Sequence, residues 1–82
     1  MTRVVFRKFG DGQVIALFPD EPWNGRGDIA SYMHVGQHGP ASRTITDCTR
    51  LATPAEYAPL LAELRGIGYE DLAVRKRMTI KN

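Results

Sequence analysis

The chain holds two histidines and one cysteine, and these are the side chains best suited to chemistry. His34 and His38 lie four positions apart in the stretch SYMHVGQHGPAS, residues 31–42. On a helix this spacing would place both imidazoles on one face, as in zinc-binding helices. The glycines and the proline of this stretch break any helix, however, and indicate a strand followed by a loop. A zinc ion would also need a third ligand such as Cys48 or Asp47, so we predict no metal site and no cofactor.

Cysteine-based catalysis requires a thiolate held beside a histidine. Asp47 and Cys48 are neighbours in the chain, but no local pattern brings a histidine to them. A lone cysteine more often serves as a small apolar side chain, and a short chain has little surface from which to build a deep pocket. We therefore predict no catalytic residue and a protein that is not an enzyme. A metal- or cysteine-dependent enzyme using His34, His38 and Cys48 is the most distant alternative.

Basic residues collect near both ends of the chain. Three lie in the first predicted strand and three in the last, namely Arg3, Arg7, Lys8, Arg75, Lys76 and Arg77. If these strands are neighbours, their side chains form one patch that could hold phosphates. The other interpretation is that lysine and arginine keep edge strands from aggregating. Nucleic-acid binding through this patch is the second functional hypothesis, although the chain has no helix-turn-helix, zinc-finger or RNA-binding sequence pattern.

Aromatic residues indicate another kind of surface. Trp23 lies inside PDEPWNGRGD, residues 19–28, a segment predicted to be a loop. There it either covers one end of the core or anchors a partner. A single helix covers one face of a small sheet, so the other face should be open and partly apolar. Protein–protein contacts, including a homodimer, are the leading functional hypothesis, and the candidate interface residues are Trp23, Tyr32, His34 and His38.

These residues are positioned by a predicted β-β-β-(β)-α-β order. Strand-like runs at 3–9 and 14–18 flank the Asp-Gly turn of GDGQ, which is a strong hairpin signal. Residues 29–35 indicate a third strand, 41–51 a short fourth strand or sheet edge, and 71–80 a last strand. The predicted fold class is α+β, a small antiparallel sheet of four or five strands with one helix packed on one face.

The helix has the clearest local signal. The segment TPAE, Thr53 to Glu56, matches a capping box with proline at the first helical position. GIGY at 66–69 supplies the stop. Pro59 removes a backbone bond to Ala55, so we expect a kink or an irregular first turn. Apolar residues recur at the spacing of one helical face, at Tyr57, Leu60, Leu61, Leu64 and Ile67.

The runs VVFRKF and VIALFP, followed by SYMHVGQHG and then ATPAEY…L…IGY, resemble a group of short bacterial proteins of uncharacterised function associated with mobile or phage-related DNA. The resemblance covers residues 4–69, and the SYMHVGQH string is its most distinctive part. Pro59 departs from the ordinary helix former expected at its position. The resemblance implies a bacterial accessory protein, such as an inhibitor or regulator of a host system, and transfers no catalytic or binding residue.

The composition fits one small domain spanning residues 1–82. A hydrophobic content of 43% with 24% charged residues is typical of a globular chain and excludes a disordered one. The single cysteine excludes an intramolecular disulfide. The longest apolar run, residues 14–18, is too short to span a bilayer, and the N-terminal residues form no signal-peptide core. We therefore expect a cytoplasmic protein without a membrane partner.

Overall fold

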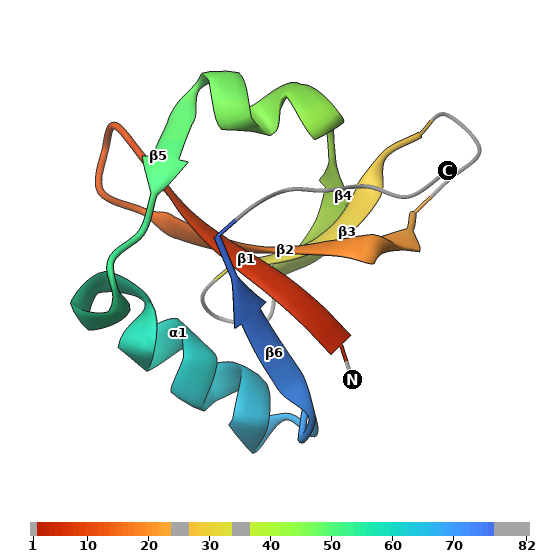
Figure 1. Ribbon diagram of the computed structural model, residues 1–82, viewed down its shortest axis with the longest axis vertical. Helices are drawn as coiled ribbons and strands as arrows, with labels where there is room; N and C mark the ends of the chain where they lie inside the picture. The colour runs from red at the N-terminus through yellow and green to blue at the C-terminus, as the bar shows by residue number, and fades with distance from the viewer. Residues whose placement is uncertain (1, 24–26, 34–36, 77–82) are drawn as a thin grey trace.

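The computed structural model describes residues 2–23, 27–33 and 37–76. Within these residues it is a small α+β domain, which confirms the predicted fold class (Figure 1). The elements, in chain order, are β1 (Thr2–Phe9), β2 (Val14–Pro22), β3 (Ile29–Met33), β4 (Gln37–Ala41), the 3-10 helix η1 (Arg43–Asp47), β5 (Thr49–Leu51), α1 (Pro54–Gly66) and β6 (Leu72–Arg75).

The strands form one sheet in the order β4-β3-β2-β1-β5, with antiparallel neighbours throughout. The strand β6 also pairs with β1, but in the parallel direction. The outer edge of β1 is therefore shared, because β5 pairs with residues 7–9 and β6 with residues 2–5. The helix α1 connects β5 to β6, which run in opposite directions along this edge. The predicted last strand is thus confirmed over 72–75, but its parallel direction was not predicted, since the sequence indicated an antiparallel sheet.

The predicted hairpin is confirmed, since β1 and β2 pair across residues 10–13 and Gly12 has a φ of 94°. The predicted loop over 19–28 is wrong in its first part, because β2 continues to Pro22. The pairing register with β3 shifts between Phe18 and Pro22. Such a bulge leaves Pro19 outside the regular ladder, whereas Pro22 is back in register opposite Ile29.

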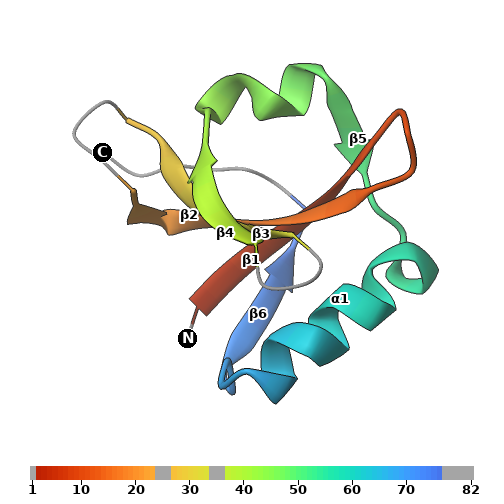
Figure 2. The ribbon, with the colours of Figure 1, turned by 180° about the vertical axis from the view of Figure 1, so that it is seen from behind.

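Both faces of the sheet are covered. The helix-side core joins α1 to alternate residues of the first three strands: Val4, Phe6, Ala16, Phe18, Tyr32, Ala52, Leu60 and Leu64. The far-side core contains Val5, Ile15, Leu17, Ile29 and Ala41, against which Ile45 of η1 packs. Figure 1 shows η1 arching over one side of the sheet while α1 lies on the other, and Figure 2 shows the same layers from behind. The expectation of an open sheet face is therefore wrong, because the segment between β4 and β5 closes over it.

The segment after β3 also differs from its prediction. Residues 37–40 were expected to be a loop but form most of β4, in which His38 pairs with Tyr32. The polar segment that follows becomes η1 rather than a strand, because the Ser42 side chain caps it by accepting from the Thr44 amide. Of the predicted strand over 41–51, only its first residue, Ala41 at the end of β4, and its last three, as β5, are extended.

The capping box of α1 is confirmed. The Thr53 hydroxyl accepts from the Glu56 amide at 3.3 Å, and the Glu56 carboxylate accepts from the Thr53 amide at 2.9 Å. The helix continues through Pro59, and its first turn is the regular capped turn. Of the two alternatives expected from Pro59, a kink or an irregular first turn, the second is wrong. The assignment of Ile67 to the buried face is also wrong, because Ile67 is 51% exposed. No helix in the described part of the chain is long and apolar enough to cross a membrane.

Candidate functional site

The basic residues of β1 are engaged within the domain. Arg3 donates two hydrogen bonds, of 2.7 and 2.6 Å, to the Asp20 carboxylate on β2. Arg7 donates to the Thr49 hydroxyl at 3.1 Å and to the Thr49 and Thr46 carbonyls. The strands β1 and β6 are neighbours, as the patch hypothesis requires, but these two side chains join strand β1 to the rest of the fold.

Lys8, Arg50 and Glu56 form a second charged cluster at the start of α1. Lys8 Nζ lies 2.5 Å from Glu56 Oε2, and Arg50 bonds both carboxylate oxygens at 3.0 and 2.6 Å. Hydrogen bonds from Arg50, from Lys8 and from the Thr53 amide hold the pKa of Glu56 well below its ordinary value of 4.5. Two cations share one carboxylate, so the cluster keeps a net charge of +1.

The depressed pKa of Glu56 predicts an acid-sensitive domain. The unfolded chain binds a proton near pH 4.5 that the folded carboxylate resists, so this carboxylate stabilises the fold above that pH. The contribution is lost as the pH falls from about 4.5 towards the folded pKa. We expect Glu56→Gln to lower the urea midpoint of unfolding at pH 7. At pH 3 the difference in midpoint between the variant and the wild type should be smaller. Glu70→Gln, at an exposed carboxylate, is the matched control. An equal difference in midpoint at both pH values would show that the Glu56 carboxylate does not stabilise the fold through its depressed pKa.

A groove lies where β5 and β6 approach each other along the shared edge of β1. The two strands run in opposite directions on this edge, so their ends converge beside Phe6. The volume of the groove is about 360 Å³. Its walls are mostly apolar, and the ring of Phe6 stacks on Tyr57 with centroids 4.5 Å apart. The residues of this β5–β6 groove are Phe6, Leu51, Ala52, Thr53, Pro54, Tyr57, Val74, Arg75 and Lys76.

Two cations stand at this groove. Arg75 and Lys76 are exposed, and neither forms an ion pair within residues 2–23, 27–33 and 37–76. The charged cluster of Lys8, Arg50 and Glu56 adjoins the groove, because Glu56 and Thr53 belong to the same capped turn. The surroundings of the groove are therefore positive, and its walls are apolar. Arg77, the sixth basic residue of the predicted patch, lies outside the described residues.

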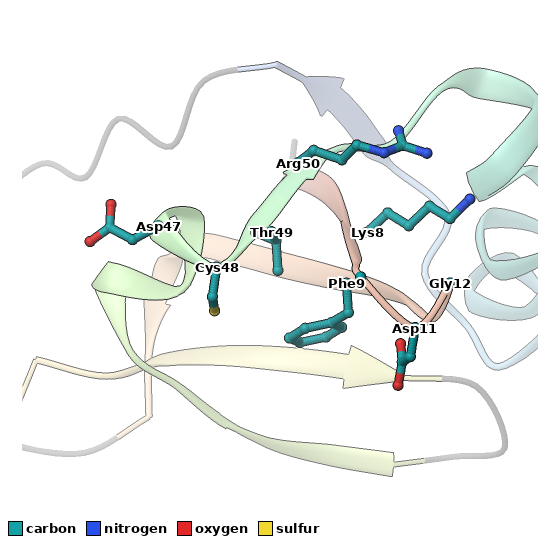
Figure 3. Close-up of a pocket in the computed structure, with 9 residues that line it drawn as sticks. Lys8, Phe9, Asp11, Gly12, Asp47, Cys48, Thr49 and Arg50 are labelled. Carbon is teal, nitrogen blue, oxygen red and sulfur yellow. The ribbon is translucent and has the colours of Figure 1, made fainter.

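A second hollow, of about 530 Å³, lies between the β1–β2 turn and the end of η1 (Figure 3). The exposed thiol of Cys48 lines it and contacts the Ile45 carbonyl at 3.3 Å. In Figure 3 the Lys8 and Arg50 side chains extend away from Cys48, and the carboxylates of Asp11 and Asp47 lie apart from it. The residues described by the structure contain no group of three His, Cys, Asp or Glu side chains that could hold a metal ion.

The aromatic candidates are placed in different environments. Tyr32 is 1% exposed in the helix-side core, and its hydroxyl donates to the Glu63 carboxylate. His38 is exposed on β4, with its ring against the Tyr32 ring at a centroid distance of 4.6 Å. A buried Tyr32 cannot present its ring to a partner. His34 lies outside the described residues.

Trp23 stands apart from this pair, at the end of β2. It is 47% exposed, and its amide donates to the Asp28 carbonyl at 2.9 Å. Its exposure agrees with the partner-anchor interpretation better than with a ring that covers the core.

Most of the groove was not predicted from the sequence. Arg75 and Lys76 were predicted as phosphate-binding residues, and Tyr57 only as part of the apolar face of the helix. Leu51 and Val74 were given no role. No local signal marks these residues as one site, since they come together only where β5 and β6 share an edge.

The fold and the site together define a small α+β domain with an apolar, cation-flanked groove at a sheet edge. No protein-family description, no curated protein and no solved structure matches the chain.

Proposed function

We propose that the protein is a small binding module that captures an acidic, partly apolar segment of a partner protein in the β5–β6 groove. The observation that carries this proposal is the pairing of apolar walls with Arg75 and Lys76, which have no ion-pair partner among the described residues. Apolar contacts supply binding energy, and complementary charge supplies specificity and a faster encounter.

A protein segment fits this site better than a nucleic acid. Phosphate binding gains affinity from each cation that contacts the backbone, but Arg3, Arg7 and Lys8 already have partners within the domain. Two cations remain at the groove, beside walls that offer an apolar side chain a place to bind. The flat base-stacking surface that single-stranded nucleic acids use is also reduced, because the Tyr57 ring stacks on Phe6.

The test is selection of a random nonapeptide library displayed on yeast against the purified chain. We expect the enriched peptides to combine acidic and apolar residues. Arg75→Glu should weaken the best of them about tenfold, because attraction becomes like-charge repulsion at the site. The matched control is Arg65→Glu, which makes the same charge change on an exposed residue in the last turn of α1, and it should change the affinity less than about twofold.

Three outcomes would overturn the proposal. One is the absence of any enriched peptide. Another is a set of enriched peptides whose affinity is lowered equally by Arg75→Glu and by Arg65→Glu. The third is tight, salt-dependent binding of a single-stranded DNA 20-mer by a chain that selects no peptide, which would assign the cations at the groove to nucleic acid instead.

A further inference from the structure

We infer that the captured segment binds as an added strand along the free edge of β6, with its side chains alternating between apolar and acidic. This inference rests on the proposed function and specifies how the partner is recognised. Strand addition obtains affinity from main-chain hydrogen bonds and specificity from pockets that receive alternate side chains.

Among the residues that the structure describes, the hydrogen-bond geometry of β6 leaves one row of its backbone groups without a partner. The Thr2 amide donates to the Asp71 carbonyl at 2.8 Å, and Thr2 lies opposite Leu72 in a parallel register. In a parallel pair the residues of one strand point alternately towards and away from the partner. The amides of Ala73 and Arg75 therefore face β1, and the amide and carbonyl groups of Leu72 and Val74 face the opposite side.

No other described strand occupies that side of β6, which pairs only with β1. No backbone hydrogen bond joins α1 to β6 among the described residues, and the buried helix residues Leu60 and Leu64 pack in the helix-side core, on the face of the sheet. Unpaired backbone groups on an edge strand are a template for another strand. The edge of β6 is therefore available at the same place as the groove.

The other end of the sheet is protected. The edge strand β4 contains Pro40, which has no amide hydrogen to donate. Proline on an edge strand is a known device against unwanted pairing, whereas no proline interrupts β6.

The side chains of β6 predict the pattern of the added strand. Val74 packs against the helix-side core, and Arg75 lies on the other face of the strand, although both line the groove. Residues directly opposite on neighbouring strands lie close enough to interact. An added strand with an apolar residue opposite Val74 and an acidic residue next to it, opposite Arg75, would make an apolar contact with the first and an ion pair with the second. The expected recognition pattern is therefore apolar and acidic residues in alternation.

The test uses the best acidic nonapeptide from the selection and amide hydrogen exchange measured by NMR. In the free chain we expect the Val74 amide to exchange fast and the Ala73 amide slowly. At a peptide concentration 100 times its Kd, the Val74 amide should exchange about 100-fold more slowly, because only the unbound fraction remains open. The amide of the exposed Gly10, in the β1–β2 turn, is the control and should not change.

A second measurement places one N-methyl group at successive positions of the same peptide. Only alternate amides of a strand face its neighbour, so we expect the loss of affinity to alternate along the peptide, about tenfold at one position and less than twofold at the next. Strand addition would be overturned if the peptide bound without slowing exchange of the Val74 amide and the loss of affinity did not alternate along the N-methylated positions. The proposed function would still stand in that case. Failure to select any peptide would instead overturn the proposed function itself.

Discussion

Replacing Tyr32 with alanine should destabilise the domain by about 3–5 kcal/mol, the cost of removing a large aromatic side chain from a core. The side chain is 1% exposed and packs in the helix-side core, and its hydroxyl donates to Glu63 on α1. Small domains have a free energy of unfolding of about 5–15 kcal/mol, so this one change would remove a large fraction of the total stability. The measurement is the free energy of unfolding from urea titration followed by circular dichroism.

Two milder variants separate the contributions at this position. Tyr32→Phe keeps the ring and removes the hydroxyl, so we expect a loss of about 1–3 kcal/mol from the Glu63 interaction. His38→Ala removes an exposed ring that contacts Tyr32, and it should cost at most about 1.5 kcal/mol. If Tyr32→Ala folded with nearly wild-type stability but lost peptide binding, Tyr32 would belong to the binding surface and not to the core.

Replacing Leu64 with alanine should cost about 2–5 kcal/mol, because its side chain is fully buried between α1 and the sheet. The truncation removes apolar contacts and leaves a cavity that the neighbouring strands fill only in part. The helix depends on this contact, since a short helix gains most of its stability from packing. The same urea titration measures the effect.

Ile67→Ala is the matched control for Leu64→Ala. Both residues continue the apolar spacing of α1, but Ile67 is 51% exposed at the end of the helix. We expect a change within about 0.5 kcal/mol. Equal losses for the two variants would show that the end of α1 is buried in solution, for instance against a second copy of the chain.

The binding proposal and these stability variants are independent of each other. Arg75 and Lys76 are exposed at the groove and contribute little to the core, so their substitution should change affinity without changing the urea midpoint. Tyr32 and Leu64 belong to the helix-side core and are not among the residues that line the groove. A loss of peptide binding in a fully folded Arg75→Glu chain therefore reports on the site.

The local elements follow from the sequence by itself. The Asp-Gly turn between two β-branched and aromatic runs predicts the β1–β2 hairpin, and the Thr53–Glu56 pattern predicts the start of α1. The alternation along 29–33 correctly assigns Ile29 and Tyr32 to opposite faces. These features depend on residues close together in the chain, whose steric preferences and hydrogen bonds act before the fold is complete.

The neighbours of each element, in contrast, were decided by the tertiary structure. Alternation shows which residues share a face but not what covers that face, so the closure of the far side by η1 was missed. The pairs Arg3–Asp20 and Lys8–Glu56 join residues 17 and 48 positions apart in the chain. Because of them, Arg3 and Lys8 of the predicted basic patch form ion pairs within the domain. The β5–β6 groove has the same origin: two strands from either side of α1 share one edge of β1, and no short stretch of sequence encodes that arrangement.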